Sequence, residues 1–137
     1  MQFYDVDEIP HIVVDNGSGS IKAGFAGEDE PTIITPTVIG RSRHRTSNID
    51  HPNDEFFIGS TAIARKEVLS IHRPIEHGIV TNWDEMEMIW HYIFQNELRI
   101  ESRDRRFIIS EAPLNPKANR EKIAQVLFER FNVQGKS

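Results

Sequence analysis

The chain has 137 residues, of which 38% are hydrophobic, and 16 Lys and Arg against 21 Asp and Glu give it a net charge of −5. This length is typical of one domain with a single modest core. The acidic balance and the absence of a dense stripe of Lys and Arg argue against nucleic acid as a partner. The sequence has no apolar run long enough for a membrane span, no signal-peptide pattern and no cysteine for a disulfide framework. We therefore expect a cytoplasmic protein that binds neither nucleic acid nor a membrane.

The N-terminal part of the chain predicts three short strands. Residues 11–15 form a β-branched run, Asn16-Gly17 is a strong turn signal, and residues 21–25 alternate apolar with polar or small side chains. This pattern predicts a β-hairpin. Residues 32–35 lie between two prolines, which suits a short strand whose ends leave the ladder.

The next part of the chain predicts a small lobe around an exposed loop. Residues 40–55, GRSRHRTSNIDHPNDE, are polar and rich in turn formers, with Ile49 as the only aliphatic side chain. Such a segment cannot form a core of its own, so we expect an exposed, mobile loop. Residues 56–58 then predict a brief strand, and residues 60–69 predict a short helix that ends before Pro74.

Two amphipathic helices complete the pattern. The first begins after Asn82, an N-cap residue with Glu85 three positions later, and the second begins after Asn115-Pro116. Spacings of three and four give each helix an apolar face: Met86, Ile89, Trp90, Ile93 and Phe94 in the first, and Ile123, Leu127, Phe128 and Phe131 in the second. Residues 107–110 predict a buried strand between them. Strands followed by such helices indicate the α/β class, with a mixed sheet and flanking helices.

The glycine-rich stretch VVDNGSGSIKAGFAG, residues 13–27, has two interpretations. In the first, Asn16, Gly17 and Gly19 only permit positive φ in a tight hairpin, as they do in many proteins without ligands. Short glycine patterns often occur by chance, so spacing alone does not exclude this interpretation.

In the second interpretation, consecutive backbone N–H groups from Gly17 to Ser20 form a concave anion nest. Lys22 would add a positive charge, Ser18 a hydroxyl, and Asp15 a carboxylate that orients water around a divalent cation. These groups suit the phosphates of a nucleotide.

Four stretches of the sequence resemble actin. DNGSGSIKAGFAGEDEP resembles the first phosphate-binding hairpin of the actin family, and GRSRH, RPIEHGIVTNWDEMEMIWH and SEAPLNPKANREK are similar to later actin stretches, in the same order. The resemblance implies part of the fold shared by actin, Hsp70 and sugar kinases, which is ribonuclease H-like. Residues 1–36 and 74–137 would form an incomplete subdomain 1. Residues 37–73, with the exposed loop 40–55, would form a subdomain 2 inserted as a small lobe.

The resemblance also implies a nucleotide site in the first hairpin. The phosphates of ATP or ADP would be contacted by Gly17, Ser18, Gly19 and Lys22. Ser20 would add a contact through its backbone only. Asp15 would act through water on bound Mg²⁺ or Ca²⁺. His77, in PIEHG, resembles the histidine that lies beneath the phosphates of many actins. No residue is assigned a catalytic role.

Further features of the family would lie beyond Ser137: the second phosphate hairpin, a second metal-orienting aspartate and a water-positioning glutamine. Full-length actins are slow ATPases. One wall of the cleft should bind nucleotide weakly and hydrolyse it hardly at all, because positioning supplies most of the catalysis in phosphoryl transfer. The same absence predicts an unpaired sheet edge near Gln134 and uncovered apolar faces around Met86 and Leu127.

Two functions remain open on the sequence. The first is an actin-like cytoskeletal protein in which this chain contributes the first phosphate-binding hairpin of an ATP or ADP cleft, with actin subunits or actin-binding proteins as partners. The alternative is a non-enzymatic interaction module that binds actin or actin-binding proteins without nucleotide.

Overall fold

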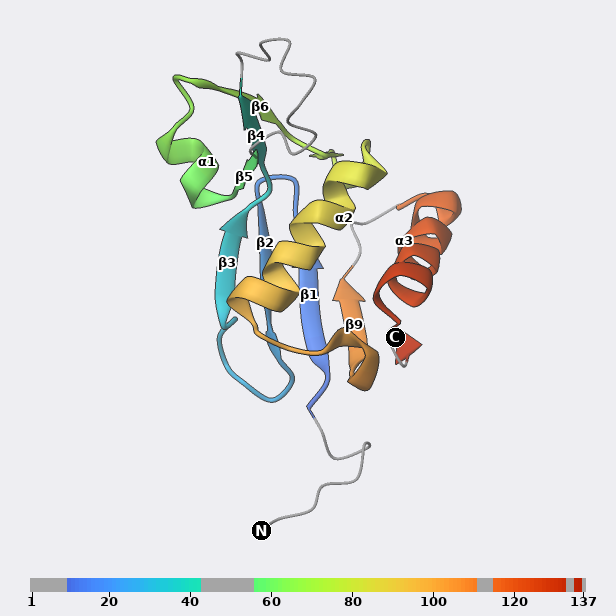
Figure 1. Ribbon diagram of the computed structural model, residues 1–137. Coiled ribbons are helices and arrows are strands. Elements are labelled where there is room, and N and C mark those ends of the chain that lie inside the picture. The colour runs from blue at the N-terminus through green and yellow to red at the C-terminus, as the bar shows by residue number, and fades with distance from the viewer. Residues whose placement is uncertain (1–9, 43–55, 111–114, 133–134, 137) are drawn as a thin grey trace.

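A computed structural model describes residues 10–42, 56–110, 115–132 and 135–136 (Figure 1). The strands of its larger sheet are β1 (Ile12–Asn16), β2 (Ser20–Phe25), β3 (Ile33–Pro36), β9 (Arg106–Ser110) and β10 (Gly135–Lys136), in the order β10-β9-β1-β2-β3. β9 is parallel to β1 and β10, whereas β2 is antiparallel to β1 and β3. The sheet is therefore mixed, and the predicted hairpin and the predicted strands on either side of it are confirmed.

A smaller sheet follows β3 in the chain. Its strands are β4 (Ile39–Ser42), β5 (Phe56–Ile58) and β6 (Leu69–His72), in the order β5-β4-β6, and helix α1 (Ser60–Ala64) lies between β5 and β6 in sequence. A two-stranded hairpin of β7 (Ile75–Glu76) and β8 (Ile79–Val80) comes next. Ile39 and Ile58 belong to the same buried cluster as the larger sheet, so the small lobe shares the main core.

The helices that cover the larger sheet are α2 (Trp83–Tyr92), continued by the π-helical turn η2 (Ile93–Glu97), and α3 (Lys117–Phe131). The short 3₁₀ helix η3 (Ser102–Asp104) precedes β9. The side chain of Asn82 accepts a hydrogen bond from the Glu85 N–H at 3.0 Å, which confirms the predicted N-cap of α2. Within the described ranges, none of the helices has the length and apolar character needed to cross a lipid bilayer.

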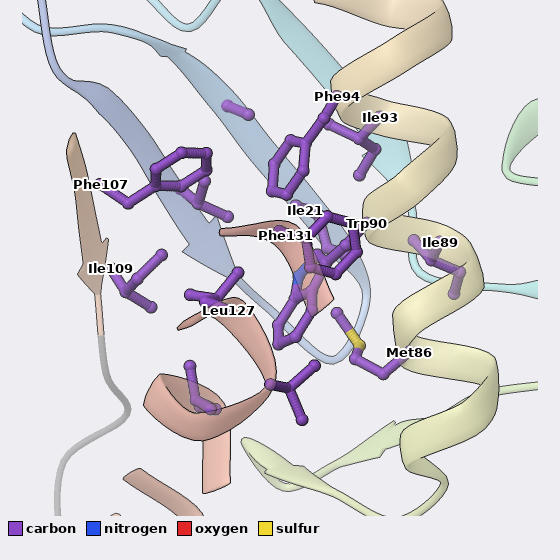
Figure 2. Close-up of a cluster of buried hydrophobic side chains, with 14 of the residues drawn as sticks. Ile21, Met86, Ile89, Trp90, Ile93, Phe94, Phe107, Ile109, Leu127 and Phe131 are labelled. Carbon is purple, nitrogen blue, oxygen red and sulfur yellow. The ribbon is translucent and has the colours of Figure 1, made fainter. Parts of the chain in front are cut away.

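The core lies between one face of the larger sheet and the two long helices (Figure 2). Every predicted apolar residue on the first helix face is at most 1% exposed. The Phe94 ring makes edge-on contacts with Phe107 at 5.0 Å and with Phe131 at 5.4 Å between centroids, joining α2 to β9 and α3. The expected exposure around Met86 and Leu127 is wrong: both are fully buried, because the helices cover each other and the same sheet face.

In the part of the chain that the structure describes, the opposite face of this sheet is open. Strand alternation directs Ile12 and Val14 into the core and Val13 to the other side, where Lys22 and Ile34 on neighbouring strands are exposed. Ile34 is 61% exposed, a high value for an aliphatic side chain on a strand. In the described part of the chain, α2 and α3 both pack on the Ile12 face, so no helix covers the second face.

Two expectations for the small lobe are wrong in their bounds. Residues 40–42, which were expected to belong to the loop, instead belong to β4, which pairs with both β5 and β6. Gly40 is buried there, and an added Cβ would come within 2.8 Å of Leu69 Cδ1, so glycine permits close packing at this position. The remaining residues of that loop, 43–55, lie outside the described residues. The helix predicted over residues 60–69 ends at Ala64, because Leu69 instead pairs with Ser42 and is buried in β6.

Two expectations near the C-terminal helix are also corrected. Phe128 is 45% exposed and Val126 is buried in its place, because spacing alone does not show which flank of the α3 stripe faces the sheet. The edge expected to lack a partner is partly paired: Gly135 and Lys136 in β10 pair with the first two residues of β9. Helix α3 returns the chain to the start of β9, and this return permits the pairing although the sequence there is not strand-like.

Candidate functional site

The candidate site lies where β1 and β9 end. These strands are parallel, so their carboxyl ends meet at one edge of the sheet, the place where open α/β sheets bind ligands. Asp15 is near the end of β1 and pairs with Lys22 on one side and Ser110 on the other. The Ser110 hydroxyl donates to Asp15 Oδ1 at 2.6 Å. Both Asp15 and Lys22 are exposed, so this edge presents one negative and one positive side chain.

The turn that joins β1 to β2 differs from the one predicted. Asn16 belongs to β1 and pairs with Ile21, which leaves Ser18 and Gly19 at the tip. The Gly17 N–H donates to the Ser20 carbonyl at 3.1 Å and closes the hairpin. None of the residues from Asn16 to Gly19 has positive φ, so the explanation of these glycines by left-handed backbone is wrong.

Close contacts with neighbouring atoms explain why residue 17 is glycine, but they do not explain Gly19. A Cβ on Gly17 would lie 2.6 Å from the Ser20 carbonyl oxygen, closer than real Cβ contacts, so the hairpin excludes a side chain there. A Cβ on Gly19 would meet no heavy atom within 4 Å. The described fold therefore does not require glycine at residue 19, and the space beside it is open for a ligand.

Thr37 holds the turn from the side of β3. Its N–H donates to the Gly19 carbonyl at 3.1 Å, and its hydroxyl donates to the Gly17 carbonyl at 2.7 Å. A trans peptide unit carries its C=O and N–H in opposite directions, so the N–H groups of Ser18 and Ser20 face away from Thr37. Among the described residues, neither the Ser18 N–H nor the Gly19 N–H has an acceptor. These amides are available to an anion.

A second hairpin supports the tip of this turn. His77 and Gly78 connect β7 to β8, with φ of 52° and 78°, as a type I′ turn requires. The Gly78 N–H donates to Ser18 Oγ at 3.0 Å. A hydroxyl that accepts one hydrogen bond still has its own proton to donate, so Ser18 remains able to bind an anionic oxygen. The His77 side chain is exposed beside this contact.

The remaining groups fit a phosphate and a hydrated cation. In the described structure Lys22 has no carboxylate within ion-pair distance, and Asp15 keeps one oxygen beyond the one bonded to Ser110. The two side chains line one end of a pocket of about 290 Å³ that continues along β2 to Pro31 on the open sheet face. No group of three or more His, Asp or Glu in the described ranges could hold a metal ion directly. Asp15 therefore lacks, among the described residues, neighbouring carboxylates that would complete a protein-only metal site, and its action on a cation through water stays a prediction.

Asn16 adds one unsatisfied donor close to the turn. Its Oδ1 accepts a hydrogen bond from Trp90 Nε1 at 3.0 Å, which fixes the side chain against α2. Its Nδ2 is buried and has no acceptor among the described residues. Buried polar atoms without partners are rare, so this atom suits a bound water or a ligand oxygen.

A comparison with protein-family models shows to which family the chain belongs. A family model described as Actin matches residues 6–136. The chain belongs to the actin family. The match covers both sheets and both long helices, so the mixed sheet with flanking helices is part of an actin fold.

Sequence reasoning selected the loop but missed the residues that position it. The turn brings together Gly17, Ser18, Gly19 and Ser20, and the adjacent strand positions bring Asp15 and Lys22 to the same edge of the sheet. Thr37, Ser110 and the Gly78 N–H were not foreseen. The sequence offered one signal for Thr37: it is a polar residue between Pro36 and an apolar run. In the structure Thr37 is fully buried, and a buried polar side chain needs hydrogen-bond partners.

Proposed function

We propose that this actin-family chain supplies a phosphate-binding hairpin to an ATP or ADP cleft of a cytoskeletal protein. The observation that carries the proposal is the turn at residues 17–20, whose carbonyls are held by Thr37 while the Ser18 and Gly19 amides have no described acceptor. A row of backbone N–H groups on a concave turn is a general solution for binding phosphate. The membership of the actin family supports the same conclusion.

Each neighbouring group has a role in this proposal. Ser18 donates its hydroxyl proton to a phosphate oxygen, Ser20 contributes its backbone N–H, and Lys22 supplies a point charge. Asp15 orients water around Mg²⁺ or Ca²⁺, which when bound neutralises phosphate charge. His77 lies at the turn that touches Ser18 and shapes the floor beneath the phosphates. None of these residues is proposed to activate the water for hydrolysis.

The open sheet face favours a second candidate function. Ile34 and the half-buried Val13 and Ile108 form a partly apolar surface beside the pocket at Lys22. Such a surface suits a non-enzymatic module that binds actin or actin-binding proteins and uses no nucleotide. The two candidates differ in whether a nucleotide binds at all.

Titration of fluorescently labelled ATP with Mg²⁺ separates the candidates. We expect weak, saturable binding by the full chain, and binding about tenfold weaker in Lys22→Ala, the factor that corresponds to a lost contact of about 1.4 kcal/mol. Lys66→Ala is the matched control, because Lys66 is also exposed but lies in the turn after α1. Its affinity should equal that of the wild-type chain.

Two results would count against the nucleotide site. An equal loss of ATP affinity in the Lys22 and Lys66 variants would show that binding depends on net charge alone. No binding by a chain that circular dichroism shows to be folded would favour the interaction module.

A further inference from the structure

A cavity of about 480 Å³ lies on the side of the core away from the phosphate turn. Its walls come from three segments: the end of α2 with η2, residues 99–103, and the last turn of α3 with Asn132. Phe94 and Phe131, both nearly buried, and the half-buried Ile100 form an apolar floor. The Ser102 hydroxyl donates to the Phe131 carbonyl at 2.6 Å and ties the loop to the helix. The cavity is therefore formed by structure that the fold already holds in place.

The rim of this cavity is positively charged although the chain carries a net charge of −5. Its lining includes Arg99, Arg103 and Arg130 but only one acidic residue, Glu101. The ion pairs at this rim are long and exposed: Arg103 to Glu101 and Arg130 to Glu87 each measure 3.8 Å. Exposed pairs of this kind contribute little and exchange readily with another carboxylate.

Arg99 occupies an unusual backbone position at the cavity. Its φ is 55°, and it directly follows Leu98, the C-cap of the π-helical turn, at the position where glycine is the favoured residue. A side chain in this left-handed conformation is disfavoured, and such positions cluster at functional sites. Among the described residues Arg99 has no carboxylate partner. The strained conformation therefore places an unpaired guanidinium at the rim.

Two carbonyl groups near the end of α3 already have hydrogen-bond donors. The Phe131 carbonyl already accepts from Ser102, and the Leu127 carbonyl accepts from the Asn132 N–H. Satisfied carbonyls oppose a bound anion less than free ones. An apolar floor with a cationic rim suits one large apolar side chain flanked by carboxylates.

We propose that this cavity binds an acidic segment of a partner protein, which packs an aromatic or long aliphatic side chain onto the floor of Phe94, Ile100 and Phe131 and pairs its Asp or Glu residues with Arg99 and Arg130. The complementary charge of the rim within an acidic chain is the reason for choosing an acidic partner. This inference does not depend on nucleotide binding, because no residue of the phosphate turn lines the cavity.

The test uses a fluorescent peptide with one Phe between Asp and Glu residues, measured by anisotropy against the full chain. We expect saturable binding that weakens as salt is raised, and affinity about threefold to tenfold lower in Arg99→Gly and in Arg130→Gln. Arg99→Gly should melt at the same temperature as the wild-type chain or higher, because glycine accepts positive φ without strain. Arg73→Gln is the control for net charge, since Arg73 is exposed and does not line the cavity.

Three results would overturn the proposal. One is an equal loss of affinity in Arg73→Gln, and another is undiminished binding of a peptide in which Asn and Gln replace the acidic residues. The third concerns the chain's own N-terminal residues, MQFYDVDEI, which also combine aromatic and acidic side chains. If deleting residues 1–9 raises peptide affinity, this segment and not a partner protein is the occupant.

Discussion

Two tight hairpin turns meet at Ser18, and they keep their shapes in different ways. The turn at His77 and Gly78 has positive φ at both central residues, as a two-residue hairpin usually does. The turn at Ser18 and Gly19 has positive φ at neither, and its carbonyls are held by Thr37 from another strand. The first turn is specified by its own backbone, whereas the second depends on contacts with residues distant in sequence.

This difference has a functional consequence. The Gly78 N–H of the first turn is used by Ser18 Oγ, whereas the Ser18 and Gly19 N–H groups of the second turn have no acceptor among the described residues. In the proposed site Thr37 would act as a positioning residue, because it holds the Gly17 and Gly19 carbonyls and so orients the Ser18 peptide unit. The comparison can be tested by disturbing the contacts of the 17–20 turn one at a time.

The largest expected effect on stability is that of the substitution Gly17→Ala. The new Cβ would lie 2.6 Å from the Ser20 carbonyl oxygen, a backbone atom that cannot move without opening the hairpin. We expect the free energy of unfolding to fall by about 2 kcal/mol, as in other overpacked sites, measured by urea denaturation.

Gly19→Ala is the matched control for this change. Its Cβ would meet open space and its φ is not positive, so stability should change by less than about 0.5 kcal/mol. Nucleotide affinity should nevertheless fall, because the methyl group occupies the space proposed for phosphate. Equal stability of the two variants would contradict the role assigned to the Gly17 contact.

A smaller effect is expected for Thr37→Val, which keeps the shape of the side chain but removes its hydroxyl. The Gly17 carbonyl loses its hydrogen bond, at a cost of about 1 kcal/mol in the free energy of unfolding. ATP affinity should fall as well, because the Ser18 peptide unit is no longer fixed.

Thr35→Val provides the comparison for that result. Thr35 is buried like Thr37 and also donates one hydrogen bond, at 2.8 Å, but to Glu97 rather than to the turn. Its variant should lose a similar amount of stability and retain the wild-type affinity for ATP. If both variants lose affinity equally, Thr37 acts through general stability and not through the turn.

Periodicity predicted the parts of the fold that local pattern determines. The N-cap at Asn82 and the buried stripe of α2 followed directly from residue spacing. The strands β4, β6 and β10 did not, because short polar segments such as residues 40–42 become strands only when their neighbours pair with them. Tertiary packing likewise decides which flank of the apolar stripe on α3 is buried.

In the candidate site, too, some residues could be predicted from the local sequence and others could not. Gly17, Lys22 and Asp15 could be selected from a local pattern, since glycine, a cation and a carboxylate lie within one hairpin. Thr37 and Ser110 contact that hairpin from positions 20 and 95 residues away from their partners. No local pattern encodes such contacts.

The most direct test of the account follows the amide resonances of an isotope-labelled full chain while ATP and Mg²⁺ are added. We expect the Ser18 and Gly19 amide signals to shift most, because these N–H groups lack described acceptors, and the Gly17 signal to shift less, because its N–H already donates to Ser20. If the Ser18 and Gly19 signals stay in place while ATP saturates the chain elsewhere, the turn does not bind phosphate and the central claim is wrong.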